Sequence, residues 1–302
     1  MTKVKTHDGV ELSTNKYIVE NMKAVVICVH GMCEHSLRYE EFALFLNQKG
    51  FSVITYDSRG HGNSLLKGED KGYQGKDGFN KMVLDLNRIV LDTKAKIPNH
   101  KIYILGHSMG SFVLERYIQL YDEVDGVIIS GSNYGTKFVK IGRFISKLVC
   151  LIRGKKRPGK LIEKLSFGNY NTAFKPNRTK FDWLSRDESS VDKYLADDFC
   201  GFTCSNQFYY DFLRGLIELS KKRNMSLIKA KLPILIVSGA KDPVGYQGEG
   251  VKRLYQVLKK SVAKVDLKLY PDGRHEMLNE LNKTEVFSDI YNWLTIQLEE
   301  IN

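Results

Sequence analysis

The feature that most constrains how this chain can fold is a serine between two glycines at the end of a strand-like segment, in Gly106–Gly110 (Gly-His-Ser-Met-Gly). Residues 101–105 before it are largely apolar, as in a buried strand, and residues 112–121 after it carry apolar side chains at helical spacing. A serine at so sharp a strand-to-helix turn is strained and points outward, and the flanking glycines allow neighbouring backbone to pass close by. The helix start adds free N–H groups and a partial positive charge beside the hydroxyl. The pattern therefore predicts a nucleophile elbow with Ser108 at its apex.

A serine hydroxyl is a weak nucleophile until a neighbouring base accepts its proton, and that base needs a carboxylate to orient it. In folds built around this elbow, the chain order is serine, then aspartate or glutamate, then histidine. The chain contains seven histidines, which are His7, His30, His35, His61, His100, His107 and His275. Because His275 alone follows Ser108, it is the predicted base.

The orienting acid is expected on a loop after the strand that precedes His275 in this order. Residues 233–239 form a continuous apolar run, and residues 240–243 follow as a turn that contains Asp242. Asp266 is the alternative, but it falls inside a strand-like pattern rather than at the end of one. An ordinary Asp-Pro turn would explain Asp242 alone, and an ordinary loop histidine would explain His275 alone. Their common order after the serine, each at a strand end, favours a catalytic set of all three.

Negative charge on an attacked carbonyl oxygen must meet N–H donors that are already in place, and removing one donor costs about 3–4 kcal/mol. One donor is expected to be the backbone N–H of Met109, directly after the nucleophile. The other is expected from the loop after an early strand, residues 24–30, which runs into a His-Gly turn. The backbone N–H of Met32 is therefore the predicted second donor.

Four segments, taken in chain order, carry a more specific pattern. They are residues 30–39 (HGMCEHSLRY), 56–64 (YDSRGHGNS), 106–110 (GHSMG) and 273–276 (GRHE). Together they resemble the monoacylglycerol lipase and lysophospholipase branch of the α/β-hydrolases. The resemblance covers most of the chain outside residues 132–230. It implies that Ser108, Asp242 and His275 form the triad and that the N–H groups of Met32 and Met109 bind the oxyanion.

The chain departs from the family pattern at two positions. Ser111 stands where relatives often have a second glycine, and Cys33 stands where a small residue is common. Serine aminopeptidases share much of the same sequence profile, so the resemblance also leaves amide substrates open.

Strand and helix patterns alternate along most of the chain. Strands are expected near residues 4–6, 10–19, 24–30, 51–57, 101–106 and 125–130, and helices near residues 38–49, 77–96 and 109–121. The alternation stops after residue 131 and returns only near residue 232. We expect an α/β-hydrolase fold in which residues 1–131 and 230–302 form a mostly parallel central sheet, with an antiparallel edge and helices on both faces. Residues 132–229 are expected to form a helical cap above the carboxyl end of the sheet, where ligands bind in open α/β sheets.

The predicted cap is rich in aromatic residues. They are Phe138, Phe144, Phe167, Phe174, Phe181, Trp183, Phe199, Phe202, Phe208, Tyr209, Tyr210 and Phe212. Some must form the core of the cap, but their number fits an apolar tunnel for an acyl chain, in which each buried methylene contributes roughly 0.8 kcal/mol.

These features predict a serine carboxylic-ester hydrolase that acts on a monoacyl lipid ester, either a lysophospholipid or a monoacylglycerol, through an acyl-enzyme. No metal or organic cofactor is required. One alternative is an aminopeptidase-like amide hydrolase, which would need an anionic pocket for the substrate amine. The other is a non-catalytic lipid-binding protein of the same fold.

The net charge of +11 is concentrated in one stretch, because residues 134–162 contain no Asp or Glu. The nine basic residues there are Lys137, Lys140, Arg143, Lys147, Arg153, Lys155, Lys156, Arg157 and Lys160. Apolar residues recur between them at helical spacing, at Phe138, Ile141, Ile145, Leu148, Val149 and Ile152. Such a helix can pack its apolar stripe over the active site, or lie on an anionic membrane as a peripheral contact, or do both. No recognisable motif supports nucleic-acid binding.

The compartment is expected to be the cytoplasm, with or without peripheral attachment to a membrane. The first residues lack the apolar core of a secretory signal, and no stretch approaches the roughly 20 apolar residues of a membrane span. The five cysteines are odd in number and have no disulfide-like spacing, so we expect reduced thiols. Cys200 and Cys204 lack a histidine nearby in the sequence, which favours core or loop cysteines over metal ligands. The sequence leaves the oligomeric state open.

Overall fold

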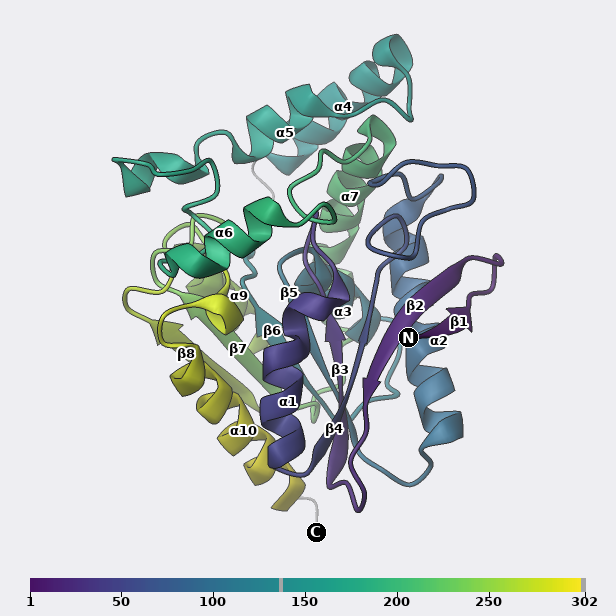
Figure 1. Cartoon of the computed structure of the whole chain (residues 1–302), viewed down its shortest axis with the longest axis vertical. Helices are drawn as coiled ribbons and strands as arrows, with labels where there is room; N and C mark the ends of the chain where they lie inside the picture. The colour runs from purple at the N-terminus through teal and green to yellow at the C-terminus, as the bar shows by residue number, and fades with distance from the viewer. Residues whose placement is uncertain (136–137, 300–302) are drawn as a thin grey trace.

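The computed structural model describes residues 1–135 and 138–299, and its centre is an eight-stranded sheet (Figure 1). The strands are β1 (Thr2–Lys5), β2 (Glu11–Tyr17), β3 (Ala24–Val29), β4 (Phe51–Tyr56), β5 (Ile102–His107), β6 (Gly126–Ser130), β7 (Ile234–Gly239) and β8 (Val265–Tyr270). Their spatial order is β1-β2-β4-β3-β5-β6-β7-β8, with antiparallel pairing from β1 to β4 and parallel pairing from β4 to β8. The predicted antiparallel edge and mostly parallel sheet are confirmed.

The central strands are buried on both faces because helices cover each side of the sheet. Successive residues of β3 alternate between two apolar cores, with Val25 in one and Val26 in the other. The first core includes side chains of α2 (Gly78–Lys96), α3 (Met109–Ile118) and α9 (Glu249–Leu258). The second includes side chains of α1 (Glu40–Gln48), which follows the 3-10 helix η1 (Ser36–Tyr39), and of α10 (Lys283–Glu299). Helices α1 and α10 lie side by side, with the ring centroids of Phe42 and Phe287 5.1 Å apart (Figure 1).

The segment between β6 and β7 contributes helices but no strand among its described residues. The helices are α4 (Val139–Arg153), α5 (Lys160–Phe167), α6 (Glu188–Ala196), α7 (Asn206–Leu219) and α8 (Lys222–Met225), together with the 3-10 helix η2 (Tyr170–Phe174). Helices α4, α5 and α6 lie beyond the end of the sheet, while α7 reaches down to the core (Figure 1). There the ring of Phe212 packs against those of Phe79 and Phe112. We refer to residues 132–229 as the cap segment; its division from the core at these boundaries stays a prediction.

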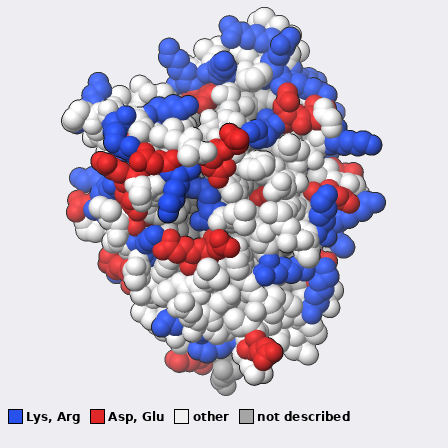
Figure 2. Space-filling view, viewed as in Figure 1, with Lys and Arg blue, Asp and Glu red and all other residues white. Residues whose placement is uncertain are grey.

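Helix α4 presents apolar side chains both inward and outward. Val149 and Cys150 are buried where α4 packs on α7. A second row of apolar side chains is exposed by 41% to 81%, and consists of Phe144, Leu148, Leu151 and Ile152; Ile141 is 58% exposed but lines the cavity beneath the cap segment. Packing over the active site therefore explains only part of the predicted stripe. Figure 2 shows Lys and Arg side chains gathered at the same end of the molecule; Lys137 lies outside the described residues.

None of the helices in the described parts of the chain combines the length and the hydropathy needed to cross a membrane. The exposed row lies on α4, an amphipathic helix of 15 residues.

Candidate active site

Ser108 occupies the sharp turn between β5 and α3 that the glycine pattern predicted. Its backbone has φ 50° and ψ −117°, a conformation that a residue with a side chain rarely adopts and that must be stabilised by its surroundings. The flanking glycines make the turn possible, because a Cβ on Gly106 would lie 2.6 Å from the carbonyl oxygen of Gly110. A Cβ on Gly110 would lie 2.2 Å from the carbonyl oxygen of Val29. The strained conformation of Ser108 thus lies where a hydroxyl must project from the end of the sheet.

The predicted acid and base are in direct contact. Asp242 follows β7, is fully buried, and has its Oδ2 2.9 Å from Nδ1 of His275, which follows β8. Its other oxygen, Oδ1, accepts the backbone N–H of Val244 at 2.8 Å, which fixes the carboxylate. Asp266, the alternative acid, lies within β8 and accepts the indole N–H of Trp293 at 2.9 Å. The geometry therefore favours Asp242 as the partner of His275.

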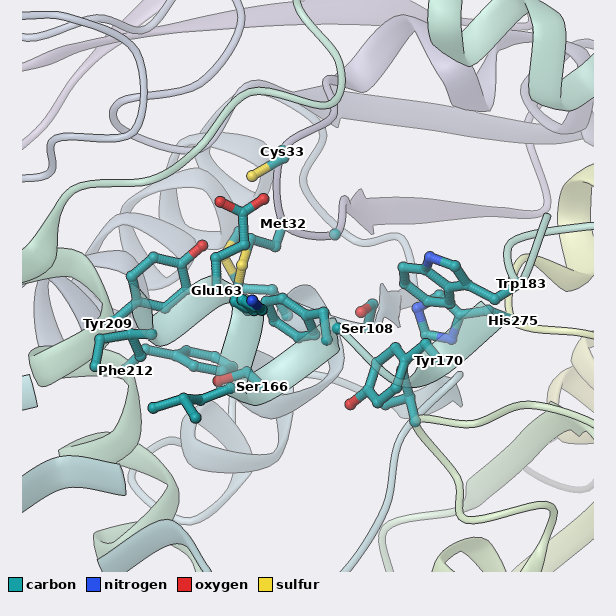
Figure 3. A pocket seen from close by; sticks show the side chains of 18 of the residues that line it. Met32, Cys33, Ser108, Glu163, Ser166, Tyr170, Trp183, Tyr209, Phe212 and His275 are labelled. Carbon is teal, nitrogen blue, oxygen red and sulfur yellow. The ribbon is translucent and has the colours of Figure 1, made fainter. Parts of the chain in front are cut away.

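Ser108 and His275 line the same cavity, and Figure 3 shows the two side chains beside one another. Because Nδ1 of His275 is engaged by Asp242, its Nε2 is the nitrogen left to act on the serine. Burial opposes the charged form of His275, but the charge of Asp242 and its hydrogen bond, together with the charges of Glu276 and Glu34, outweigh burial and raise the pKa of the imidazole. The arrangement can therefore accept a proton and hold it.

A second histidine lies beside this pair without being part of it. The ring centroids of His107 and His275 are 4.7 Å apart, and a Cβ on Gly131 would lie 3.0 Å from Cε1 of each ring. Burial, and then the charge of His275, lower the pKa of His107 to about 4. His107 is therefore neutral near pH 7 and adds no competing charge.

The two residues predicted to supply the oxyanion donors line the same cavity as the serine. Met109 is the first residue of α3, so its N–H is among those that a helix N-terminus leaves free. Met32 follows β3 through Gly31, and both methionines line the cavity with Ser108. Gly31 brings the two loops together, because a Cβ there would lie 3.2 Å from Cβ of Ser108.

A buried ion cluster, which the sequence did not lead us to expect, supports the loop that carries Met32. Oε1 of Glu34 accepts the N–H of Gly31 at 2.5 Å, while Oε2 accepts from Arg38 at 2.6 Å. The guanidinium of Arg38 also makes two 2.6 Å hydrogen bonds to Glu276, the residue after His275. Burial opposes the charge of Glu34, but Arg38, together with His107, His30 and the N–H of Gly31, outweighs burial and lowers the pKa of the carboxyl. All three residues lie in the segments that resemble the lipase branch, and that resemblance was the available signal.

Segment 56–64, which also resembles the lipase branch, stabilises the same loop through hydrogen bonds. Asp57 accepts the backbone N–H of Ser36 at 2.9 Å and that of Asn63 at 2.8 Å. His30 accepts the N–H of Ser58 at 2.8 Å through its Nε2. These hydrogen bonds give a structural reason why segment 56–64, although far from Ser108 in the sequence, belongs to the pattern that resembles the lipase branch.

The cavity has a volume of about 750 Å³ and runs between the core and the cap segment. Of the aromatic residues in the predicted cap, those that line it are Phe138, Phe167, Phe181, Trp183, Phe202, Tyr209 and Phe212. Tyr170 joins them, and the ring of Trp183 lies 5.1 Å from that of His275. Phe208 instead packs in the apolar core. Aliphatic side chains of α4 and α7, such as Ile145 and Leu216, complete an interior suited to an apolar ligand.

One carboxylate in this cavity differs from the others. Glu34 and Glu276 are both ion-paired with Arg38, whereas the carboxylate of Glu163 on α5 makes no ion pair or hydrogen bond with the residues that the structure describes. Figure 3 shows Glu163 near Met32 and Tyr209, on the cap side of the cavity. A polar group of a ligand can therefore be recognised there.

Comparisons with known proteins agree on one family. The family model described as serine aminopeptidase, S33, matches residues 20–282. The chain is 28% identical over 291 residues to a monoacylglycerol lipase from Mycolicibacterium smegmatis, covering 91% of this chain and 89% of the relative. It is 23% identical over 283 residues to a probable lysophospholipase L2 from Haemophilus influenzae, covering 91% and 85%. In fold it matches a thermostable carboxyl esterase from Bacillus coagulans, solved in complex with glycerol, with a TM-score of 0.92, 24% identity and coverage of 98% of both chains.

Proposed function

The chain belongs to the serine aminopeptidase S33 family of α/β-hydrolases, and we propose that this ester hydrolase cleaves monoacyl lipids, namely a monoacylglycerol or a lysophospholipid, through an acyl-enzyme. The observation that carries the proposal is that Ser108 and His275 line one cavity of about 750 Å³, whose walls are largely aromatic and aliphatic. A monoacyl lipid has one long apolar chain and one polar head, and such a cavity matches that division. The named activities of the two sequence relatives are in keeping with it.

The reaction begins when Ser108 Oγ attacks the ester carbonyl carbon and its proton passes to Nε2 of His275. Asp242 holds the ring through Nδ1 and stabilises the imidazolium that forms. The carbonyl oxygen becomes an oxyanion, which accepts hydrogen bonds from the N–H groups of Met32 and Met109. Because these donors are fixed before the reaction, they stabilise the charge without further rearrangement.

The tetrahedral intermediate collapses when the bond between the carbonyl carbon and the alcohol oxygen breaks. His275 gives its proton to that oxygen, and the alcohol leaves while the acyl group stays on Ser108. Water then attacks the acyl-enzyme by the same route, with His275 accepting the water proton and returning it to the serine. The products are a free fatty acid and the original enzyme.

The cap segment supplies the walls that hold the acyl chain. Trp183 and Leu184 are fixed beside the base, because their carbonyl oxygens accept the N–H groups of His275 at 3.4 Å and of Glu276 at 2.8 Å. Each methylene removed from water by these walls contributes roughly 0.8 kcal/mol, so long chains are expected to bind more tightly than short ones.

Glu163 favours a second candidate, the amide hydrolase. A carboxylate without a protein partner can bind the ammonium group of a substrate with a free N-terminus, as an aminopeptidase requires. It can equally accept hydrogen bonds from the hydroxyls of a glycerol head. The Glu163→Gln variant separates the two, because it keeps a hydrogen-bond acceptor and removes the charge.

The outward apolar row of α4 supports a further part of the proposal, a peripheral contact with an anionic membrane. Arg143, Lys147 and Arg153 accompany that row, and each basic residue near such a surface contributes on the order of 1 kcal/mol. Contact between α4 and a membrane would bring the cap-side end of the cavity close to the lipids that serve as substrate.

The substrate proposal is tested with a panel of monoacylglycerols, lysophospholipids and aminoacyl anilides, measured as kcat/KM. We expect the monoacyl esters to be cleaved faster than the anilides, and Glu163→Gln to retain most of the ester activity. Faster cleavage of the anilides, with a selective loss in Glu163→Gln, would assign the amide function instead.

A further inference from the structure

Three side chains of the types that bind metal ions meet where the cap segment touches the loop after β3. They are His35, Asp197 and Cys200, and their ligand atoms all lie within 4.8 Å of one another. Nε2 of His35 is 2.7 Å from Oδ2 of Asp197. The sequence has no histidine near Cys200. The structure brings His35 to it, a residue 165 positions earlier that lies on the core side of the contact between the core and the cap segment.

The cluster has the donor set that zinc prefers, with an imidazole nitrogen, a carboxylate oxygen and a sulfur. A carboxylate and a thiolate together balance the charge of one divalent ion. The side chain of His35 is 8% exposed and that of Asp197 is 30% exposed, so the cluster is sheltered but open to an ion from solvent. Water can occupy the fourth position of a tetrahedral site.

The ligands on the cap side are held in place by their own backbone. Oδ1 of Asp197 accepts the N–H of Phe199 at 2.8 Å, which leaves Oδ2 directed at His35. The N–H of Cys200 donates to the carbonyl oxygen of Asp197 at 2.9 Å, so a tight turn returns the sulfur toward the carboxylate. Such supporting bonds are a regular feature of metal sites because they orient the ligands.

The neighbouring cations do not compete for the carboxylate. The guanidinium of Arg38 is bound by Glu34 and Glu276. The ammonium of Lys71 donates to the backbone oxygen of Asp198 rather than to Asp197.

We propose that His35, Asp197 and Cys200 form a zinc-binding site that links the cap segment to the oxyanion loop, residues 30–35 after β3. Nε2 of His35 coordinates as a neutral imidazole, because the proton between it and Asp197 exchanges through solvent to Nδ1, and the thiol proton of Cys200 passes to solvent as the sulfur coordinates. The same contact already contains two hydrogen bonds to the carbonyl oxygen of Cys33, from Gly201 N–H and from the Tyr194 hydroxyl, each at 2.9 Å. The ion is structural: no step of ester cleavage passes through it, and the site does not depend on which ester is cleaved.

The test measures binding of zinc alone to the full-length protein after treatment with a chelator, by isothermal titration calorimetry. We expect one saturable site with a dissociation constant in the micromolar range or below, and an increase in Tm when zinc is added. Cys200→Ala and Asp197→Asn are each expected to weaken binding by about tenfold or more and to remove the increase in Tm. Cys150→Ala is the matched control, because Cys150 is a cysteine of the same cap segment outside the cluster, and it is expected to bind zinc like the wild type.

Cobalt(II) provides a readout of the sulfur itself. Bound cobalt is expected to show a thiolate-to-metal charge-transfer band in the wild type and in Cys150→Ala, but not in Cys200→Ala. Absence of saturable zinc binding by the wild type would overturn the proposal. Equal zinc affinity in Cys200→Ala and Cys150→Ala, or a cobalt band that persists in Cys200→Ala, would place the metal elsewhere and overturn it as well. If Cys200→Ala fails to fold, Asp197→Asn decides the outcome by its zinc affinity, and an affinity equal to that of Cys150→Ala would overturn the proposal.

Discussion

The side chain of Glu34 accepts the backbone N–H of Gly31 at 2.5 Å, so the residue before the predicted oxyanion donor Met32 is fixed by a carboxylate three positions further on. The same carboxylate is bound by Arg38, which in turn holds Glu276 next to the base. One buried cluster thereby sets the positions of the oxyanion loop and of the histidine loop together.

Replacing Glu34 is therefore expected to reduce kcat more than it changes KM. Glu34→Ala removes both the bond to Gly31 and the ion pair with Arg38, and misplacing one oxyanion donor costs up to about 10²-fold in kcat. Glu34→Gln keeps an acceptor for Gly31 and is expected to lose less. Steady-state kinetics on a short-chain ester separate the two effects; an unchanged kcat in Glu34→Ala would show that the loop holds its position without this side chain.

Asp242→Asn is expected to lower kcat by about 10³- to 10⁴-fold while the protein remains folded, because the amide no longer stabilises the imidazolium. The pH profile gives a second readout. Asp242 raises the pKa of His275 against the effect of burial, and the base works only when it is neutral. The activity of the wild type is therefore expected to fall as the pH drops through a pKa above 6.5, and the variant is expected to move that limb to lower pH. An acid limb at the same pH in both proteins would contradict the assigned partnership.

Glu115 offers a test of stability away from the reaction. It is buried on α3, where burial raises the pKa of its carboxyl to about 8 and its Oε1 accepts the hydroxyl of Ser132 at 2.7 Å. Because the folded state holds this proton more tightly than the unfolded state, the free energy of unfolding should fall as the pH rises from 4.5 to 8. Glu115→Gln removes that dependence and is expected to be more stable than the wild type by on the order of 3 kcal/mol at pH 7. Urea unfolding at pH 5, 7 and 9 checks this, and a difference that does not grow with pH would refute it.

The membrane contact proposed for α4 depends on its outward apolar row. Leu151 and Ile152 are 70% and 81% exposed, so replacing both with Asp should leave the fold intact. Losing two inserted side chains is expected to cost about 3 kcal/mol and more than tenfold in partitioning to vesicles that contain phosphatidylglycerol. Leu227→Asp is the control, since Leu227 is 60% exposed but lies after α8. Equal flotation of the wild type and the double variant would count against the contact.

Much of the core was predictable because its signals are local. The apolar runs that became β3, β5 and β7 are continuous, and the chain order alone selected His275 from seven histidines. The orienting acid was harder to predict, because the sequence distinguishes Asp242 from Asp266 only by its place after the end of a predicted strand. The structure separates them by their partners, which are His275 and Trp293.

The cap segment was less predictable because its contacts join residues far apart in the sequence. The spacing of residues in the sequence does not show that Glu163 lines the cavity, because this depends on how α5, a helix of eight residues, is oriented against the core. The approach of His35 to Cys200 depends on how the cap settles on the core, which no local pattern encodes. The apolar stripe of α4 was visible, but only packing against α7 shows which of its residues face outward.

Labelling by a fluorophosphonate probe, followed by intact mass spectrometry, tests the central claim most directly. We predict that the wild type gains a single adduct, that peptide mapping places it on Ser108, and that Ser108→Ala gains none. The matched control is Ser111→Ala, one turn into the same helix, which should label like the wild type. An unlabelled wild type, or equal labelling of Ser108→Ala, would contradict the account.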